Sequence, residues 1–464
     1  MASNPNYCDI TPEIEALAAQ SLQNSSIDAG DYVKYDVKRG LRDLNGKGVL
    51  AGLTEISDII AKKMVDGQEI PCDGKLYYRG IDVEKLVAGA LKEGRFGFEE
   101  TAYLLLLGRL PNAAELESFK NQLAYYRTLP GNFVRDVILK APSQDIMNSL
   151  ARSVLNLASY DERCDDISLP NVMRQCLQLI ALFPVLSVYG YQAYTYKSGN
   201  SLYIHAPQPE LSTAENFLRM IRPDKHFTQE EARLLDLCLV CHAEHGGGNN
   251  STFTCRSVSS TGTDTYSAIA AAVGSLKGPK HGGANRQVLA QFSLIKQTVR
   301  DWKDDDAVAD CVGRILRREL GDGSGLIYGM GHAVYTLSDP RTVILRKSAR
   351  TLAAQRGMLD ELELMEAVER VTPRVFAEIT GHEKVMCANV DMYSGLIYQM
   401  LDIPPDLFTP LFAVARITGW CAHRMEEVLT GGRLYRPAYK SLTRHREYIP
   451  MAARTYRKNP LPAE

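Results

Sequence analysis

Apolar residues recur along most of the chain at the three- and four-residue spacing of helices, and Gly or Pro interrupts the pattern at intervals. Thr11 followed by Pro12 predicts a helix start, because a hydroxyl can cap the first turn and Pro is tolerated there. An apolar run ends at Gly108, after which Asn112 can cap the next helix. The same alternation of helix and break continues almost to the C-terminus.

Strand-like sequence is confined mainly to residues 49–81, where GVLAGLTEIS and KLYYRGIDV form short runs bounded by Gly and Asp. The rest contains no repeat of fixed period and no low-complexity segment. The sequence therefore predicts a mainly α fold with minor β near the N-terminus. Because residues 286–391 are richer in charge, we expect them to form a small helical domain beside a large helical domain made of 1–285 and 392–464.

Composition is that of a globular enzyme, with 45% hydrophobic and 23% charged residues among 464. A net charge of -2 provides no basic field for nucleic acid or an anionic membrane, so an anionic substrate must meet a local arginine cluster. The most apolar stretch, residues 179–190, contains Pro184 and is shorter than the roughly 20 residues that span a bilayer. The N-terminus has no secretory pattern. We expect neither a nucleic-acid nor a membrane partner.

The ten cysteines are scattered without a disulfide frame, which favours a reducing cytoplasm. Cys238 and Cys241 precede His242 and His245, so a metal site must be weighed. Residues 232–242 have a helical pattern, however, and no second Cys pair follows at zinc spacing. We therefore interpret these thiols as buried and expect no metal site.

Chemistry-bearing residues concentrate after residue 240, where glycines flank histidines in GPKHGGAN and GMGHAVY. Flanking glycines let a ligand approach His281 and His332 closely, and this favours function over packing. Other site classes fit poorly: HAEH is not the HExxH of zinc proteases, and GDGSGL around Ser324 is only a distant approach to a GxSxG elbow. No phosphate-binding P-loop occurs.

These segments resemble the citrate synthase family over most of the chain, from His242 to Pro437 above all. HAEHGGGNNST, GPKHGGAN, GMGHAVYTLSDPR, ANVDMYSG, LFAVARITGW and YRP match family motifs in the same order, and KLYYRGIDVEKL and FEETAYLLLLGRLP are similar upstream. The resemblance implies the family's mainly α fold and an acyltransferase of the tricarboxylic acid cycle. It would condense acetyl-CoA with oxaloacetate and hydrolyse citryl-CoA to citrate and CoA.

The resemblance also implies roles for three catalytic residues. Asp391 would take a proton from the acyl carbon next to the thioester carbonyl. His281 would donate a hydrogen bond to that carbonyl oxygen, and His332 would polarise the oxaloacetate ketone. This pairing of base and donor is also what the chemistry needs, because a carboxylate can remove so weakly acidic a proton only if the developing oxyanion is stabilised. A helix start after GPKH should keep His281 neutral, whereas Asp391 taken alone could be a plain helix cap.

The remaining implied residues bind the two substrates. Oxaloacetate would be held by His245, Arg341, Arg416 and Arg436, of which Arg436 would come from the neighbouring subunit of a homodimer. CoA, a substrate rather than a permanently bound cofactor, would lie against four backbone positions and one lysine side chain, namely Leu326, Ile327, Gly329, Gly331 and Lys384. The chain departs from the family pattern at Lys280, Thr336 and Ala388. Thr336 replaces a basic residue, so the residues that contact the phosphates are not fixed by the motif.

Three alternatives stay open from the sequence. A 2-methylcitrate synthase would use propionyl-CoA with the same residues, because one methylene is worth only about 1–3 kcal/mol in a pocket. A metallohydrolase with His242 and His245 as ligands is a second alternative. A non-catalytic CoA-binding or scaffold protein is the third, but it would not need intact catalytic positions.

Overall fold

The computed structural model describes residues 9–24, 27–43, 47–332, 334–382 and 385–454. It divides into two compact units: unit 1 contains Met1–Ala51 and Arg436–Glu464, and unit 2 contains Gly52–Tyr435. Unit 2 holds the bulk of the chain and is mainly α, as predicted.

Unit 1 is built from both ends of the chain and has no buried residue among those the structure describes. The predicted helix start at Pro12 is confirmed. The N- and C-terminal segments meet where Lys440 Nζ lies 5.6 Å from the Tyr35 ring centroid. The helices of unit 1 are α1 (Pro12–Asn24), α2 (Ala29–Lys34), η1 (Arg39–Leu41) and η4 (Met451–Ala453).

Unit 2 begins with a small antiparallel sheet of order β1-β2-β3, within the predicted region. β1 (Ser57–Val65) and β2 (Gln68–Tyr78) are joined by a two-residue Asp66-Gly67 turn, where both residues have positive φ as this hairpin type requires. β3 (Ile81–Asp82) pairs with the end of β2. The strand expected from residue 49 was placed too early: residues 49–56 form no strand, and the Glu55 amide donates instead to the Glu426 carboxylate.

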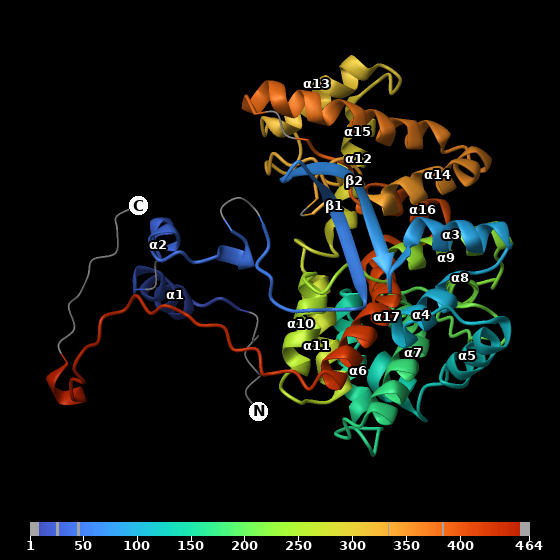
Figure 1. Cartoon of the computed structure of the whole chain (residues 1–464), viewed down its shortest axis with the longest axis horizontal. Coiled ribbons are helices and arrows are strands. Elements are labelled where there is room, and N and C mark those ends of the chain that lie inside the picture. The colour runs from blue at the N-terminus through green and yellow to red at the C-terminus, as the bar shows by residue number, and fades with distance from the viewer. Residues whose placement is uncertain (1–8, 25–26, 44–46, 333, 383–384, 455–464) are drawn as a thin grey trace. The chain divides into compact units, whose positions relative to one another are not determined.

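Helices make up the rest of unit 2 (Figure 1). Capping follows the sequence: Gly108 ends α4 in the left-handed conformation, and Asn112 forms a complete capping box on α5, as predicted. The helices are α3 (Val83–Lys92), α4 (Phe98–Leu107), α5 (Ala113–Tyr125), η2 (Val134–Leu139), α6 (Ile146–Ala158), α7 (Leu169–Lys197), α8 (Thr213–Ile221), α9 (Gln229–His242), α10 (Asn250–Ser259), α11 (Thr265–Lys277), α12 (Ala284–Thr298), α13 (Asp305–Leu316), α14 (Pro340–Gln355), α15 (Leu359–Thr380), α16 (Asp391–Met400), η3 (Pro405–Leu407) and α17 (Phe408–Leu429).

The centre of unit 2 is α17, which is buried on almost every side and packs against α4, α7, α9, α10 and α11. α7 is 29 residues long and has an apolar window long enough to cross a bilayer by length and composition. Because 78% of that window is buried by other parts of the chain, α7 has the character of a core helix.

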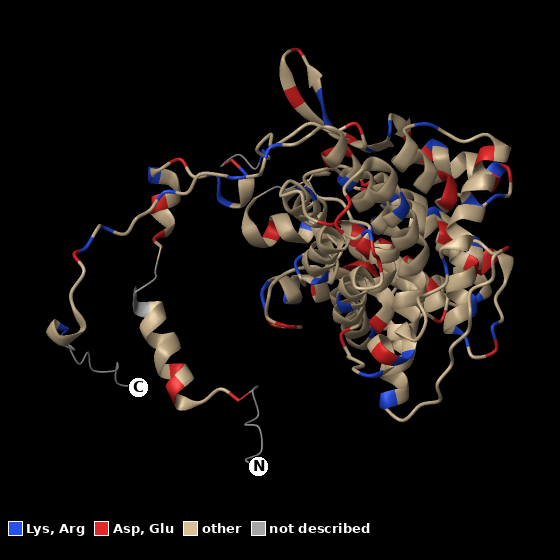
Figure 2. Ribbon diagram, turned by 90° about the horizontal axis from the view of Figure 1, so that it is seen from below, with Lys and Arg blue, Asp and Glu red and all other residues tan. Residues whose placement is uncertain are grey.

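The helices from α12 to α16 form a second group, in which α13 packs on α15, α12 on α16, and α14 on α15 and α16. α14 also packs on α9 and α3, so it joins this group to the rest of unit 2. The domain division at residues 286 and 391 stays a prediction. Lys and Arg are interspersed with Asp and Glu along the ribbon, as the small net charge leads one to expect (Figure 2).

Candidate active site

The turn that follows α9 carries His245, which is 7% exposed. The hydroxyl of Tyr78, the last residue of β2, lies within hydrogen-bond distance of the Val240 and Glu244 carbonyl oxygens and so fixes this turn. Burial lowers the pKa of His245 well below its ordinary value, and the charge of Arg341 lowers it further. His245 is therefore neutral near pH 7, and its buried Nε2 has no partner among the described residues.

The GMGH and ANVD motifs lie side by side, although the sequence separates them by more than fifty residues. Met330 and Ala388 form an antiparallel backbone bridge. The Asn389 side-chain amide closes the pair by donating to the carbonyl of the glycine before His332, at 3.0 Å. The Gly331 amide donates to the Cys387 carbonyl and the Asn389 amide to the Gly329 carbonyl, so the segments that carry His332 and Asp391 are fixed against each other.

The hydrogen bonds of His332 define its tautomer. Its Nδ1 accepts the backbone amides of Val334 and Tyr335 at 2.9 and 3.0 Å. A ring nitrogen that accepts carries no hydrogen, so a neutral His332 carries its hydrogen on Nε2. The rings of His332 and His245 lie 5.2 Å apart. Arg341 Nη2 also approaches Nε2, at 3.4 Å, but the two shorter amide bonds to Nδ1 outweigh this contact and leave the hydrogen on Nε2.

The loop between His332 and α14 rests on the β1-β2 hairpin at Gly74. The Gly74 amide donates to Ser338 Oγ at 3.1 Å. A Cβ at Gly74 would lie 2.2 Å from the Ser338 carbonyl oxygen and 2.5 Å from the Tyr335 ring. Only glycine allows this close approach, and the hairpin therefore helps to fix the loop.

Arg341 lies in the first turn of α14 and is held by Asp339, the cap of that helix. Its Nε and Nη2 donate to the two oxygens of Asp339 at 3.0 and 2.6 Å, a bidentate pair in which both side chains are almost fully buried. Burial alone would lower the pKa of Arg341, but the Asp339 charge raises it above its ordinary value. Its cation is thus already compensated within the chain.

Arg416 lies in the middle of α17 and is 0% exposed. Its Nε donates to the His242 carbonyl at 2.8 Å, and its guanidinium stacks 4.9 Å from the Phe412 ring centroid. Both Nη atoms are buried and have no hydrogen-bond partner among the described residues. Burial lowers the pKa of Arg416 to about 10, with a further contribution from Arg341. Four N–H groups thus point at no internal acceptor.

His281 lies in the turn before α12, where its Nε2 is 3.1 Å from both Asn249 Oδ1 and Ser251 Oγ. Trp420 Nε1 donates to the same Ser251 oxygen at 3.1 Å. Burial lowers the pKa of His281 to about 4, and the charge of Arg416 adds to this shift. The expectation that His281 is neutral is confirmed, and the causes are burial and the charge of Arg416.

Asp391 is the first residue of α16, but its carboxylate makes no capping hydrogen bond. The interpretation of Asp391 as a plain helix cap is therefore wrong: Oδ1 is buried and has no partner among the described residues. Burial raises the pKa of Asp391 to about 7, against the lowering effect of Arg341 and Arg416. A carboxyl with this pKa is suited to accept a proton near neutral pH.

Six of the predicted residues gather in one place: His245, His281, His332, Arg341, Asp391 and Arg416. Arg341 and Arg416 both act electrostatically on His245 and on Asp391, and Arg416 acts on His281. Arg436 belongs to unit 1, where it is exposed, and is not placed relative to this cluster. Lys384 lies outside the described residues.

The segment expected to contact CoA is held by Gln291 of α12. Gln291 donates to the Leu326 carbonyl at 2.8 Å and accepts the Tyr328 amide at 2.9 Å. Leu326 is 57% exposed, whereas Ile327 is buried. Gly329 and Gly331, the other two predicted positions, both have positive φ. This segment is therefore a fixed turn with an exposed apolar side chain.

The three departures from the family motifs lie in different surroundings. Lys280 is exposed, whereas Ala388 is fully buried in its bridge to Met330. The Thr336 hydroxyl is buried without a hydrogen-bond partner among the described residues. The Thr336 hydroxyl thus points inward rather than to solvent.

The histidines weighed as metal ligands do not share a helix, because α9 ends at His242. His242 Nδ1 lies 2.8 Å from the Cys238 carbonyl, and Cys238 and Cys241 are buried free thiols, as predicted. Within the described residues, the one set of three possible ligand atoms close together is Cys164, Asp165 and Asp264, on another part of unit 2.

Sequence reasoning missed the residues that hold the predicted ones, namely Asp339, Gln291, Asn249, Ser251 and Asn389. The two asparagines and the serine stand in the quoted motifs, but each also bonds to a residue at least thirty positions away, namely His281 or Gly331. Asp339, in the DPR motif itself, was the one with a local signal.

Known proteins of one family match the chain over most of its length. The family model described as citrate synthase, C-terminal domain, matches residues 43–438. A citrate synthase from Synechocystis is 37% identical over 82% of this chain and 89% of its own, and a 2-methylcitrate synthase from Shewanella oneidensis is 32% identical over 82% and 92%.

Solved structures agree in fold. Citrate synthase from Pyrobaculum aerophilum superposes with a TM-score of 0.72 at 30% identity, covering 88% of this chain and 95% of that one. The Thermoplasma acidophilum enzyme, solved as a ternary complex with carboxymethyl coenzyme A and oxaloacetate, gives 0.74 at 26% identity and covers 90% and 99%. The chain belongs to the citrate synthase family.

Proposed function

We propose that the cluster around Asp391 and Arg416 condenses acetyl-CoA with oxaloacetate and then hydrolyses citryl-CoA to citrate and CoA. The observation that carries the proposal is the buried guanidinium of Arg416, whose two Nη atoms have no hydrogen-bond partner among the described residues, close to a carboxyl of raised pKa. A buried cation of this kind needs an anion, and a dianionic keto acid supplies one.

Oxaloacetate is held by groups of two kinds. Arg416 offers a two-pronged donor for one carboxylate, and Arg341 adds positive charge. The Nε2–H of His332 donates to the ketone oxygen, which draws electron density from the carbon to be attacked. His245, neutral and 5.2 Å from His332 between ring centroids, contributes a further hydrogen bond.

The acyl group reacts between Asp391 and His281. Asp391 takes a proton from the carbon next to the thioester carbonyl, while neutral His281 donates to the oxygen on which negative charge develops. The carbon so activated forms a bond to the ketone carbon, whose oxygen takes up a proton on the His332 side. Water then cleaves the thioester C–S bond, and CoA leaves as the thiol.

The tautomer of His281 decides whether it can donate. The Ser251 oxygen accepts from Trp420, and its single hydrogen has two acceptors within reach, Asn249 Oδ1 at 2.9 Å and His281 Nε2 at 3.1 Å. When that hydrogen is given to His281 Nε2, the imidazole keeps its hydrogen on Nδ1, where it is available to the thioester oxygen. Ser251 is thus a positioning residue for the donor.

CoA enters as a substrate and leaves as a product, and no permanently bound cofactor is part of the proposal. The turn from Leu326 to Gly331, held by Gln291, would contact CoA, and Lys384, which lies outside the described residues, would contact its phosphates. The exposed Leu326 side chain gives an apolar surface against which an adenine ring can pack.

Closure of residues 286–391 over the rest of the chain would complete the acyl-CoA site. Arg341 and His332 lie inside that segment, and Arg416 and His245 lie outside it, so bound oxaloacetate would join the two sides. Acetyl-CoA affinity should then rise when oxaloacetate is saturating. An affinity independent of oxaloacetate would exclude closure as the coupling device.

Each active site would include Arg436 of a partner subunit, which makes the homodimer the functional form. An Asp391→Ala chain and an Arg436→Ala chain, each inactive, should regain activity when their subunits exchange. Half of the dimers become hybrids by random exchange, and one site of each hybrid is intact, so about a quarter of all sites should recover. No recovery after verified exchange would show that Arg436 serves its own chain.

A cytoplasmic location is proposed from the unpaired cysteines.

Release of free thiol from acetyl-CoA in the presence of oxaloacetate tests the proposed reaction. We expect turnover that a metal chelator does not abolish, and chelator-sensitive turnover would revive the metallohydrolase alternative. Because 2-methylcitrate synthases also occur among the relatives, the same assay with propionyl-CoA is needed. A higher kcat/KM for propionyl-CoA would assign the chain to that activity instead.

A further inference from the structure

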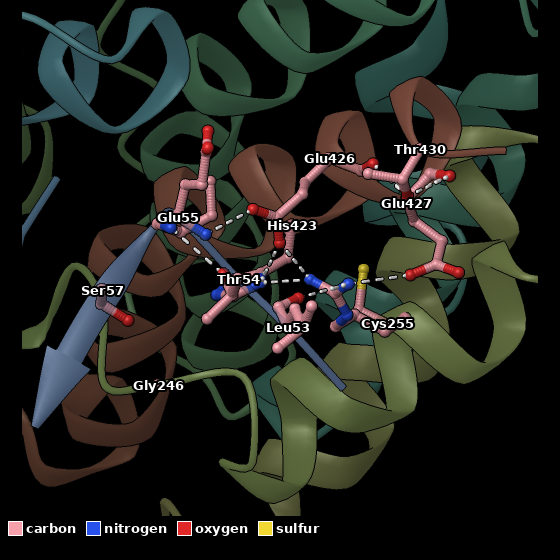
Figure 3. A network of polar contacts seen from close by, with 12 residues as sticks. Leu53, Thr54, Glu55, Ser57, Gly246, Cys255, His423, Glu426, Glu427 and Thr430 are labelled. Carbon is pink, nitrogen blue, oxygen red and sulfur yellow. Dashed lines mark hydrogen bonds and ion pairs between the residues drawn. The ribbon is translucent and has the colours of Figure 1, made fainter. Parts of the chain in front are cut away.

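A network of polar contacts around His423, outside the groups assigned to the substrates, joins Gly246 to the last turns of α17 (Figure 3). It starts at Glu244, which is fully buried. One oxygen of this carboxylate accepts Ser57 Oγ at 2.9 Å, the Gly246 amide at 2.6 Å and His423 Nε2 at 3.0 Å. The residues on both sides of His245 in sequence are thereby fixed through one side chain.

His423, on α17, joins Glu244 to Arg256 on α10. Arg256 Nη1 lies 3.0 Å from His423 Nδ1. A guanidinium can only donate, so Nδ1 accepts and the ring hydrogen lies on Nε2, which donates to Glu244. Both ring nitrogens are therefore committed, and the orientation of the imidazole is fixed at each end.

Arg256 is held at its outer end by groups from three parts of unit 2. Its guanidinium pairs with Glu426 and Glu427 in the last turns of α17. The same group approaches the Leu53 carbonyl and the Tyr435 hydroxyl, each at 3.4 Å. These residues lie near the two points at which the chain enters and leaves unit 2, so Arg256 has little freedom to move.

The space around Glu244 leaves no alternative position for its carboxylate. A Cβ at Gly419, on the neighbouring turn of α17, would lie 2.2 Å from Glu244 Oε2. Gly246 has a φ of +86°, which only glycine adopts readily, and it turns the chain so that its amide reaches the same carboxylate. The direction in which His245 points thus depends on where Glu244 is held.

We propose that Arg256 and His423 are positioning residues for oxaloacetate, because through Glu244 they hold His245 in place. The proposal rests on the function proposed above, in which His245 contacts oxaloacetate. Neither residue touches a substrate. A small displacement of His245 lowers the occupancy of the productive geometry, and such displacements can cost up to about a hundredfold in catalysis.

A positioning role and a purely structural role differ in what they change. Loss of structure lowers the fraction of folded enzyme, which reduces the maximal rate and leaves KM unchanged. Loss of positioning raises KM for oxaloacetate in the fraction that is folded. KM for acetyl-CoA, measured at saturating oxaloacetate, should change little because His281 and Asp391 are held by other contacts.

The test compares three variants of the full chain with the unmodified protein. His423→Leu removes both hydrogen bonds and should raise KM for oxaloacetate at least tenfold. His423→Gln, which retains one donor and one acceptor, should recover most of that loss. The control is Arg424→Leu on the same helix, because Arg424 is also buried but donates to the Ser259 and Thr263 carbonyls instead. It should lower stability and leave KM unchanged.

A threefold or smaller change in KM for oxaloacetate in His423→Leu would overturn the proposal, provided that thermal unfolding shows a folded protein. An equal rise in the Arg424→Leu control would also overturn it. If His423→Leu does not fold, Tyr435→Phe removes the hydroxyl that contacts Arg256 Nε and Glu427 and should raise the same KM by about two- to threefold. An unmodified chain with no activity on oxaloacetate would reject the proposed function itself, which separates the two failures.

Discussion

The site contains two buried arginines that differ in one respect. Arg341 is compensated by a bidentate bond to Asp339, whereas Arg416 has one backbone acceptor and two unpartnered Nη atoms among the residues described. Their pKa values move in opposite directions, because the Asp339 charge outweighs burial at Arg341, whereas the Glu244 charge offsets burial only in part at Arg416.

This difference indicates which of the two arginines lacks a counter-charge that an anionic substrate could supply. A buried cation that is paired within the chain contributes to the fold, and removing one partner leaves the other uncompensated. A buried cation without a partner is a cost to the free protein that an anionic ligand can relieve. We therefore expect Arg416 to contribute mainly to ligand binding, and Arg341 to contribute both to the stability of the fold and to ligand binding.

The largest expected effect concerns Asp391, which both arginines influence. Asp391→Asn keeps the side-chain volume and removes the base, so kcat should fall by about a thousandfold or more. KM for oxaloacetate should stay within a few fold, because neither arginine is altered. Stopped-flow or steady-state thiol release measures the loss. A rate within tenfold of the unmodified chain would remove Asp391 from the role of base.

Matched substitutions test whether the two arginines contribute differently to stability. Arg341→Met leaves the buried Asp339 carboxylate unpaired and should lower the free energy of unfolding by about 3–5 kcal/mol. Arg416→Met removes a cation that forms no ion pair in contact and whose burial Glu244 offsets only in part, so stability should stay nearly unchanged or rise. Both should raise KM for oxaloacetate by about a hundredfold. Urea denaturation measures the free energy of unfolding of the two variants. Equal destabilisation would show that the surroundings of Arg341 and Arg416 are electrostatically equivalent.

Asp391, whose pKa both arginines lower, should make the free energy of unfolding depend on pH. Its pKa is raised by burial from 3.8 to about 7 in the folded chain. Below the unfolded value both states hold the proton, so the group contributes nothing. As pH rises from about 4 to about 7, the unfolded state has lost its proton while the folded state still holds it, and stability falls by up to about 1.4 kcal/mol per pH unit.

Asp391→Asn should therefore be more stable than the unmodified chain by a margin that grows between about pH 4 and pH 7 and is constant above. All other titrating groups cancel in this difference. Arg416→Met should extend the window to higher pH, because Arg416 lowers the pKa of Asp391. Denaturation curves at one-unit pH intervals test both statements, and a margin independent of pH would contradict them.

The sequence predicted the chemistry of the site better than its supports. His245, His281 and Asp391 were predicted because glycine-rich turns and motif order mark them, and the structure brings them together. The asymmetry between the arginines was not predicted, because it depends on which acceptors are near a buried guanidinium. Motif spacing carries no such information.

For the fold, features that depend on local sequence were predicted, and a feature that depends on a distant contact was not. Helix starts at Pro12 and Asn112 follow from local capping chemistry and are confirmed. The first strand was misplaced because the Glu55 amide donates to Glu426 of α17, far away in sequence, and not to a neighbouring strand. A contact with a distant helix cannot be inferred from local alternation. The roles of Lys384 and Arg436 stay predictions.

The smallest expected effect concerns His281, whose pKa burial lowers to about 4 with help from Arg416. Ser251→Ala removes the hydroxyl that can direct the imidazole hydrogen to Nδ1, and leaves Asn249 as the remaining partner of Nε2. The imidazole then favours a hydrogen on Nε2, because an amide oxygen accepts and cannot donate. The population able to donate to the thioester falls, and kcat should drop by about tenfold, a fraction of what a lost oxyanion donor costs. KM for oxaloacetate should not change, since the contacts of Arg416 and His332 are untouched.

Ser251→Thr keeps the hydroxyl and is the matched control. A loss of equal size in both variants would assign the effect to packing, and an unchanged rate in Ser251→Ala would show that Asn249 alone sets the tautomer.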